Sequence, residues 1–226
     1  MKIVPVARSA ELAGASPAEF VPLPEAFYNR SPLEVAPALL GRYLMRAWRG
    51  RLWRARIVEV EAYLGENDPA AHAWRGPTPR NRVLFGPPGR AYVYFIYGMH
   101  YCLNVSAQPR GQAGCVLIRA AEAIGPEWRS RVQALSSPAR HRLLSGPGRL
   151  ARALHIGRGL NGCDLTRPGR LWIAAAPARG GGMPREPVSV GPRVGIRRAR
   201  ELPARFYLAH SPAVSGFAAP PKKKSR

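Results

Sequence analysis

Two glutamates stand two residues apart in the apolar stretch RIVEVEAYL, which alternates in polarity and is rich in β-branched residues. In a strand, successive side chains point to opposite faces, so Glu59 and Glu61 share one face with Ile57 and Tyr63. The chain has only 13 acidic residues, and a buried carboxylate is costly unless it is paired or used. The two groups therefore either act as acid or base in a reaction, or pair with nearby arginines. Alternation alone does not decide which glutamate would act.

A histidine and several arginines follow in the turn-rich segment GENDPAAHAWRGPTPRNRVLFGPPGR, for which we expect a long loop with one short helical piece at most. His72 lies eleven residues beyond Glu61, and a lone loop histidine is either a surface residue or a site group. Arg75, Arg80 and Arg82 are predicted to bind phosphate or to cap carbonyl groups of the loop.

The run YVYFIYGMHYCLN predicts a β-hairpin whose strands cover residues 92–96 and 101–105, with Tyr97, Gly98 and Met99 at the turn. Tyrosines in strands usually pack in the core or across strands. An aromatic side chain at an exposed turn has no such partner. In a strongly basic chain, Tyr97, with Met99 beside it, is therefore a candidate wedge that enters a stack of nucleic-acid bases.

The segment SGPGRLARAL combines small residues with the start of a short helix that Gly157 would end. Backbone N–H groups and the positive end of a helix dipole favour phosphate at such a place. Ser145, Gly146, Gly148 and Arg149 are therefore candidate contacts to a nucleic-acid backbone. The alternative is an ordinary helix N-cap at Ser145.

Charge is the main feature of the composition. The 226 residues include 35 Lys and Arg against 13 Asp and Glu, which gives a formal net charge of +22 and a sequence pI of about 11.4. Proteins of this kind usually bind polyanions, above all nucleic acid; an Arg-, Ala- and Pro-rich background is the alternative explanation. Lysine occurs only at positions 2 and 222–224, so the body of the chain has none to form a Schiff base.

Cysteine and histidine are too scattered for a metal site. Cys102, Cys115 and Cys163 are an odd number at no ligand-like spacing, and we expect neither a metal nor a cofactor. The N-terminus MKIVPVARSAELAG lacks the apolar run and the cleavage site of a signal peptide. No apolar stretch has the length of a membrane span. We therefore expect a soluble, intracellular protein with free cysteines.

These residues are expected to lie in a single α+β domain over residues 25–215, between a loosely ordered segment 1–24 and a disordered basic tail 216–226. A helix is expected to begin at Ser31 or Pro32 and to stop at Gly41. Strands are expected in RLWRARIVEVEAYL, in both halves of the hairpin, in CVLIRAAEA and in GCDLTRPGRLWIAA. The stretch EWRSRVQALSSPARHRLL is expected to be helical or irregular, AAPARGGGMPREPVSVGP a loop, and PRVGIRRARELPARFYL the end of the fold.

Together, these segments closely resemble the alkyladenine, or methylpurine, DNA glycosylases of the mammalian type, from about Phe27 to Pro212. VEAYLG, TPRN and YVYFIYGMHYCLN, in that order, are highly specific in combination. The further segments that carry the resemblance are LLGRYL, DPAAHAWRG, GCVLIRAAE, SGPGRLARAL, PRVGI and RFY. The resemblance implies a curved, largely antiparallel sheet with surrounding helices and long loops, and a protruding β-hairpin that enters the minor groove of DNA.

The resemblance also implies roles for individual residues. Glu61, rather than Glu59, would be the general base, with Arg119 near the catalytic water. Asn104 would exclude guanine sterically, through the 2-amino group of that base. The residues that would enclose the extruded base are Tyr63, His72 and Tyr94.

At the DNA surface, Tyr97 and Met99 would enter the minor groove, while Arg80 and the start of the SGPGRLARAL helix would bind the backbone. The implied activity is that of a monofunctional glycosylase of base excision repair. It would release alkylated or deaminated purines such as 3-methyladenine, 7-methylguanine, hypoxanthine and ethenoadenine, without lyase activity. The implied partner is double-stranded DNA, with no membrane, no obligatory protein partner and a monomeric state. The protein would lie in the cytoplasm at the nucleoid, or in the nucleus of a eukaryote.

Three departures from the family pattern affect groove contacts and substrate range. His100 replaces an aromatic residue, an insertion in SAQPRGQAG precedes Arg119, and WRG follows His72 in place of a more polar segment. The residues expected to carry the reaction are unaffected.

Two other functions stay open at this point. A basic nucleic-acid-binding protein without catalysis would explain the charge and Tyr97, but would leave the two glutamates without a purpose beyond ion pairs. A metal-dependent nuclease would use Glu59, Glu61 and Asp68, although the chain lacks a denser acidic cluster.

Overall fold

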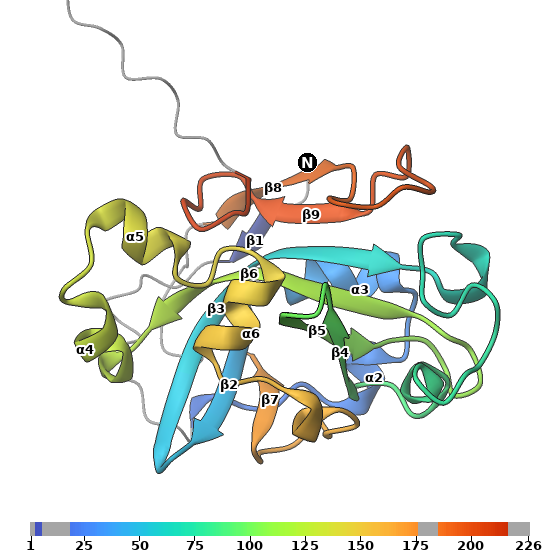
Figure 1. Ribbon diagram of the computed structural model, residues 1–226, viewed down its shortest axis with the longest axis horizontal. Coiled ribbons are helices and arrows are strands. Elements are labelled where there is room, and N and C mark those ends of the chain that lie inside the picture. Colours follow the sequence, from blue (N-terminus) through green and yellow to red (C-terminus); the bar gives the residue numbers. More distant parts are fainter. Residues whose placement is uncertain (1–2, 6–18, 176–184, 217–226) are drawn as a thin grey trace, which may run out of the picture.

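The computed structural model describes residues 3–5, 19–175 and 185–216, which form one α+β domain around an open sheet (Figure 1). Among these residues the sheet has nine strands, and every pairing is antiparallel. Its main path runs β1-β8-β9-β3-β6-β5-β4, and β2 pairs with both β3 and β7. The expected class and the largely antiparallel sheet are thus confirmed. The strands are β1 (Ile3–Pro5), β2 (Tyr43–Trp48), β3 (Arg51–Tyr63), β4 (Ala91–Ile96), β5 (His100–Ser106), β6 (Cys115–Ile124), β7 (Leu171–Ala174), β8 (Arg185–Gly191) and β9 (Arg205–Leu208).

The long strand β3 lies at the centre of the sheet and changes partner halfway along one edge. Residues 51–56 pair with β2, whereas residues 59–61 pair with β9. The other edge pairs with β6, with register shifts on both sides of Glu59. Such irregularities bend a strand and increase its twist. Glu59 and Glu61 therefore stand at the bend where β2 gives way to β9.

The helix α3 (Pro32–Leu39) begins as the sequence predicts. Ser31 caps it by accepting a hydrogen bond from the Leu33 N–H at 3.3 Å, and proline is well suited to the first helical position. The chain turns at Gly41, which has a φ of 78°. The buried face of α3 packs mainly against β3.

The other helices are short. Figure 1 shows α3 behind the sheet and α6 (Pro147–Ala153) in front of it, beside the β4–β5 hairpin. In the part of the chain that the structure describes, no helix is long and apolar enough to cross a bilayer. The remaining helical pieces are α2 (Glu25–Tyr28), α4 (Arg129–Val132), α5 (Ser137–Arg142) and the 3₁₀ turns Gly65–Asn67, Arg82–Phe85, Pro126–Trp128 and Arg158–Leu160.

The β4–β5 hairpin leaves the sheet as it approaches its turn. The two strands pair with each other along β4, but only Asn104–Ser106 of β5 also pair with β6. At the tip, Tyr97 and Gly98 have φ values of 53° and 67°, a combination typical of tight hairpin turns, and the Met99 N–H donates to the Ile96 carbonyl at 3.2 Å. The Tyr97 side chain is 77% exposed. The hairpin therefore protrudes as expected, and its entry into a DNA groove stays a prediction.

Two expectations about the ends of the fold are wrong in part. Residues 185–191 form strand β8 rather than a loop, because β1 and β9 pair with its two edges. At the start of the chain, residues 3–5 form strand β1, and Phe20 and Leu23 are buried. The expected loose order of residues 1–24 is therefore wrong for these parts. Residues 6–18, residues 176–184 of the expected loop, and the predicted tail beyond Gly216 lie outside the described residues.

The loop between β3 and β4 is more structured than its composition predicts. It contains two 3₁₀ turns where one helical piece at most was expected, and Ala73 and Leu84 are buried against Tyr92. Asn81 is also buried, and its amide donates to the His72 carbonyl at 2.9 Å. These contacts fix the part of the loop that carries His72.

Candidate active site

The register of the sheet brings side chains of four strands to one face. Glu61 of β3 stands opposite Leu117 of β6, Leu117 stands opposite Asn104 of β5, and Asn104 stands opposite Tyr92 of β4. Directly opposed residues in antiparallel strands project from the same face. Residues two positions away, such as Tyr63, lie on that face as well. The strands thus form the floor of a single site.

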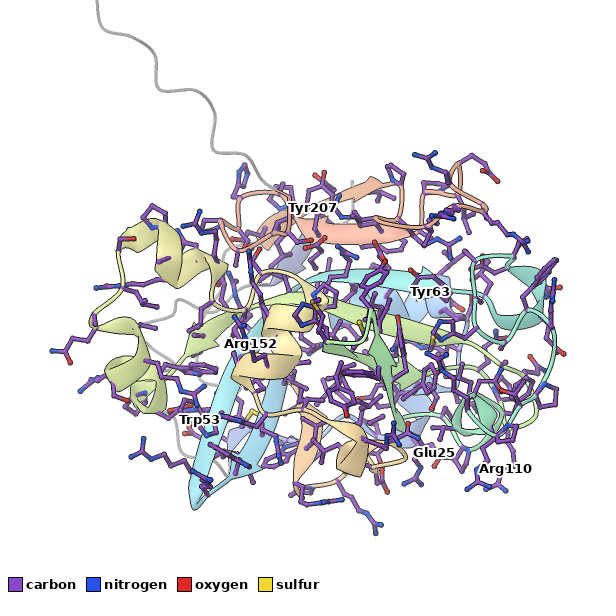
Figure 2. The ribbon with its side chains drawn as sticks, viewed as in Figure 1. Glu25, Trp53, Tyr63, Arg110, Arg152 and Tyr207 are labelled. Carbon is purple, nitrogen blue, oxygen red and sulfur yellow. The ribbon has the colours of Figure 1, made fainter. Side chains whose placement is uncertain are left out.

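A pocket of about 390 Å³ opens above this row, a volume within the range of small-molecule sites. The loop after β8 contributes Val194, Gly195 and Ile196 to its lining. Figure 2 shows Tyr63 at the end of β3. Of the residues that the sequence proposed for a site or for DNA contact, those that line the pocket are Tyr63, His72, Tyr94, Tyr97, Asn104, Arg119 and Gly148.

Glu61 lies directly beneath this pocket and is fully buried. Its Oε1 accepts a hydrogen bond from the Val194 N–H at 2.7 Å and lies 3.2 Å from Arg119 Nη1. Its Oε2 accepts a hydrogen bond from the Tyr63 hydroxyl at 3.0 Å. All three partners line the pocket, whereas Glu61 itself does not reach the pocket surface. The carboxylate is therefore in direct contact with three groups that line the pocket.

Burial dominates the electrostatics of the Glu61 carboxylate. Removal from water raises the pKa of Glu61 above its ordinary value. Arg119, the Val194 N–H and the Tyr63 hydroxyl oppose this effect by stabilising the charge, and the nearby Glu59 adds to it. The result is a carboxylate that is a stronger base than a solvated glutamate, as proton transfer near neutral pH favours.

Glu59 is equally buried, but its surroundings differ. Its Oε1 accepts hydrogen bonds from Arg119 Nε at 3.0 Å, Arg205 Nε at 2.7 Å and Ser215 Oγ at 2.8 Å. Its Oε2 accepts a hydrogen bond from the Ser215 N–H at 2.6 Å. Both glutamates therefore pair with Arg119, as the second alternative expects, and Glu61 also contacts groups that line the pocket. A role for either glutamate in a reaction stays a prediction.

Aromatic side chains form the wall of the pocket. The rings of His72 and Tyr94 meet edge to face with centroids 4.4 Å apart, and His72 Nδ1 lies 2.9 Å from the Tyr92 hydroxyl. Partial desolvation, together with the charge of Arg80, lowers the pKa of His72 and so favours the neutral imidazole, although the residue as a whole is exposed. Burial raises the pKa of both Tyr63 and Tyr94 far above the usual range, so both phenols stay protonated. The wall is therefore aromatic and uncharged.

Asn104 is held at the floor of the pocket and is buried. Its Nδ2 donates to the Tyr92 carbonyl at 3.2 Å, and its Oδ1 lies 3.8 Å from Cys115 Sγ. Both ends of the amide therefore have a partner, which restricts its rotation. The location suits a steric gate, and discrimination between bases stays a prediction.

The residues expected at the hairpin surface lie together. Tyr97 lines the pocket, and the neighbouring Met99 is 69% exposed. Arg80 is exposed and reaches the same hairpin, since its Nη2 donates to the Phe95 carbonyl at 3.3 Å. One exposed surface thus carries two apolar side chains and a guanidinium beside the pocket.

The start of α6 contradicts the simpler of its two interpretations. The N-cap is Gly146, with a φ of 101° and no side-chain cap, whereas Ser145 is buried and bridges to β6. Gly148 packs so closely on the hairpin that a Cβ there would lie 2.9 Å from His100 Cγ. Arg149 is exposed. An ordinary N-cap at Ser145 is therefore wrong, and contact of these residues with DNA stays a prediction.

Some pocket residues had no role assigned from the sequence. Tyr92 lines the pocket, and strand alternation counted back from Tyr94 is the signal that would have found it. Val194 and Ile196 belong to the segment PRVGI, where no local pattern marks a site. Their place depends on a contact between residues 133 positions apart.

The third carboxylate that a nuclease would use is engaged elsewhere. Asp68 is buried, and both of its oxygens accept hydrogen bonds from Arg193, one of them at 2.9 Å. Within residues 3–5, 19–175 and 185–216, no group of three or more His, Cys, Asp or Glu is placed to hold a metal ion. Asp68 therefore does not join Glu59 and Glu61 in a carboxylate cluster.

Comparison with protein families matches most of the chain to a known group. The family described as methylpurine-DNA glycosylase matches residues 26–212. The chain belongs to the methylpurine-DNA glycosylase family. It is therefore a DNA glycosylase, a hydrolase of N-glycosyl bonds, and a DNA repair protein.

Similar proteins from other organisms cover most of the chain. A relative from Koribacter versatilis is 48% identical over 204 residues, which are 89% of this chain and 97% of the relative. One from Chlorobaculum parvum is 46% identical over 204 residues, 88% and 94% of the two chains. One from Methanocella arvoryzae is 46% identical over 198 residues, 85% and 95% of the two chains. Each carries the provisional name 3-methyladenine DNA glycosylase. These relatives are bacterial and archaeal, so they do not support the mammalian type within the family.

Proposed function

We propose that this DNA glycosylase extrudes alkylated or deaminated purines from double-stranded DNA into the pocket and hydrolyses the N-glycosidic bond with a water that Glu61 activates. Its substrates are of the 3-methyladenine, 7-methylguanine, hypoxanthine and ethenoadenine class, and its product is an abasic site in an intact strand. It acts as a monomer at the nucleoid in the cytoplasm, without a cofactor or an obligatory protein partner.

One observation carries the proposal: a carboxylate with a raised pKa lies directly under an aromatic pocket of about 390 Å³. A base inside a duplex hides its glycosidic bond, so the nucleotide must leave the stack before reaction. With the base in the pocket, the sugar carbon C1′ to which it is bonded faces the Glu61 carboxylate. A water that replaces the Tyr63 hydroxyl at Oε2 can then give a proton to Glu61 as its oxygen bonds to C1′. The bond between C1′ and the base nitrogen breaks, and its electron pair leaves with the base.

Charge supports the same assignment. Positive charge develops on the sugar as the bond breaks, and the buried Glu61 carboxylate favours that charge. Arg119 Nη1, 3.2 Å from Glu61 Oε1, can donate a hydrogen bond that orients the attacking water. The two side chains thus act on the nucleophile and on the sugar.

The pocket wall suits the leaving group. Purines such as 3-methyladenine and 7-methylguanine are cationic in DNA, and a cation over an aromatic face gains roughly 0.5–2 kcal/mol. Tyr63, His72 and Tyr94 line the pocket and, as uncharged rings, do not repel such a base. Cationic purines are also good leaving groups, so activation of water is the main requirement.

The exposed surface suits duplex DNA. Tyr97 and Met99 stand at the tip of the protruding hairpin, next to the pocket, and can fill the gap that an extruded nucleotide leaves. A net charge of +22 favours binding to the phosphate backbone. Arg80 and the start of α6, with Arg149, are the proposed phosphate contacts.

Release of free base from methylated duplex DNA, in buffer without added metal ion, tests this function. The wild-type protein should release alkylated purine and leave the strand intact until alkali is added. A binding protein without catalysis would shift the DNA and release no base. A nuclease would cut the strand directly and would require a divalent metal ion.

A further inference from the structure

We infer that Glu59, Arg205 and Ser215 form a clamp that positions Arg119 for the reaction at Glu61; this inference rests on the proposed function. The three clamp residues do not line the pocket, whereas Arg119 does. They therefore act through Arg119 and are positioning residues rather than catalytic ones.

The Arg119 guanidinium is held at each of its nitrogens. Nε donates to Glu59 Oε1 at 3.0 Å, and Nη2 donates to Ser215 Oγ at 3.1 Å. Nη1 lies 3.2 Å from Glu61 Oε1. The clamp thus binds one edge of the guanidinium and leaves the opposite nitrogen facing the carboxylate under the pocket. Ordering a side chain as long as arginine is costly, so a fixed orientation requires such contacts.

The backbone at Arg119 is also built for this orientation. Glu59 of β3 pairs with Ala120, and Val60 pairs with Ile118, so Arg119 falls at a register shift and lacks a direct cross-strand partner. Irregularities of this kind are common beside active sites, where they redirect a side chain. The same shift places Arg119 between Glu59 and Glu61.

Ser215 ties the last described segment of the chain to the site. Its N–H and Oγ donate to the two oxygens of Glu59 at 2.6 and 2.8 Å. Its carbonyl accepts a hydrogen bond from Arg205 Nη2 at 2.8 Å. Each polar group of this half-buried serine is therefore engaged in the clamp, which links the segment after β9 to Arg119.

The clamp divides Arg119 between two carboxylates. Guanidinium groups form strong bidentate pairs with a single carboxylate when geometry allows. If Glu59 did not hold Nε, Arg119 could turn and pair with both oxygens of Glu61, which would stabilise the anion and weaken the base. Two carboxylates and two guanidiniums also balance in charge, whereas loss of the Glu59 charge would leave an excess positive charge beside Glu61.

Glu59→Gln, with Glu122→Gln as its matched control, tests the clamp. Glu122 is likewise held by an arginine and a serine, Arg56 at 2.6 Å and Ser211 at 2.6 Å, but lies outside the lining of the pocket. In single-turnover excision at pH 7, Glu59→Gln should be roughly 10- to 100-fold slower, with affinity for abasic-analogue DNA within about twofold of wild type. The pH at which the excision rate falls to half on the acidic side should shift to lower pH by roughly one unit. Glu122→Gln should change neither the excision rate nor the acidic midpoint of its pH profile.

A second pair of variants separates positioning from stability. Ser215→Ala removes the hydroxyl that binds Glu59 and Arg119 and should slow excision roughly tenfold, and Ser215→Thr, which keeps the hydroxyl, should restore the rate. Ser211→Ala breaks a similar serine–glutamate bond in the same segment. It should lower the melting temperature to a similar extent without changing the excision rate.

Titration of the Glu61 carboxyl by ¹³C NMR tests the clamp without any enzymatic readout. Glu59→Gln should move the midpoint of this titration to lower pH, whereas Glu122→Gln should not. If the wild-type protein releases no base, the proposed function fails, and the titration still decides on the clamp. An unchanged midpoint in Glu59→Gln, or slowing by Ser211→Ala equal to that by Ser215→Ala, would overturn the inference.

Discussion

The Glu61 carboxylate is held by groups from three separate parts of the chain. Tyr63 follows it on the same strand, Arg119 lies on β6, and Val194 comes from the loop after β8. None of these contacts brings the carboxylate to the surface of the pocket. The desolvation that results raises the pKa of Glu61 more than its hydrogen bonds lower it.

The pH dependence of base release follows from this shift. The deprotonated carboxylate is the active form, so the rate should fall as the pH falls through the pKa of Glu61. Because burial raises that pKa, the midpoint should lie above the ordinary glutamate value of about 4.3. Single-turnover excision measured across pH, with folding followed by circular dichroism, gives this midpoint. A midpoint at or below the ordinary pKa of glutamate would contradict the raised pKa of Glu61.

Asn104 is expected to set the choice of base. Asn104→Ser should relax discrimination against guanine-type bases, because a shorter side chain leaves room for the 2-amino group at the pocket floor. Single-turnover rates over a matched series of lesions measure this selectivity. Asn104→Leu, similar in size to the natural residue, should keep the exclusion. If Asn104→Ser has wild-type selectivity, Asn104 does not form the gate.

The choice between the two glutamates could not be made from local sequence. Strand alternation correctly placed Glu59 and Glu61 on one face, because a period of two is a property of the strand alone. Their roles differ because Ser215, 156 residues from Glu59, caps one carboxylate, and Val194, 133 residues from Glu61, holds the other. Such long-range partners leave no trace in a short window, so the resemblance to a family was needed to select Glu61.

At the level of secondary-structure elements, the β4–β5 hairpin carries the proposed contact with the DNA interior. Its outer part has no pairing with β6, so the tip extends away from the sheet. Tyr97 has a positive φ of 53° there, which is uncommon for a residue with a side chain and is often found at functional sites. The element thus holds an aromatic ring where core packing does not cover it.

Tyr97→Ser should weaken extrusion. Loss of the ring removes a stacking contribution of about 1–3 kcal/mol, which corresponds to roughly 5- to 150-fold in the extrusion equilibrium. Excision of a paired lesion should slow by this amount, while excision of a lesion in an unpaired position should change less. Tyr97→Phe, which keeps the ring, should behave like the wild type. Equal losses on paired and unpaired substrates would indicate misfolding instead.

Elements with strong local signals were predictable, and those that depend on distant pairing were not. The cap at Ser31 and the turn at Gly41 define α3, and alternation defines β3 and the hairpin. Strand β8 was missed because REPVSVG follows a Pro- and Gly-rich stretch, and its pairing with β1 and β9 is invisible in the local sequence. The shift at Arg119 was equally hidden, because it arises only from the pairing of β3 with β6.

At the scale of the whole molecule, the use of arginine rather than lysine restricts the reactions that the protein can catalyse. The net charge of +22 draws the protein to DNA, yet lysine occurs only at positions 2 and 222–224, all outside the described residues. The folded body therefore carries its positive charge on arginine, which binds phosphate but does not form a Schiff base. This composition favours the proposed nucleophile, a water activated by a carboxylate.

This composition predicts a glycosylase without lyase activity. Borohydride reduction during turnover should trap no covalent adduct between protein and DNA, because no internal lysine is available to attack C1′. The strand should break only after alkali is added. Gel analysis of reduced and unreduced reactions measures both results. Efficient trapping would contradict the prediction and would point to the amine of Met1 or Lys2.

Single-turnover excision by Glu61→Gln tests the central assignment most directly. The change removes the base and the negative charge but keeps the shape of the side chain, so binding to abasic-analogue DNA should persist. Base release should fall by about 10²- to 10⁴-fold, the usual contribution of a positioned general base. The slow variant Glu59→Gln should retain more activity than Glu61→Gln. Near wild-type release by Glu61→Gln, with Glu59→Gln inactive, would show that the other carboxylate activates the water.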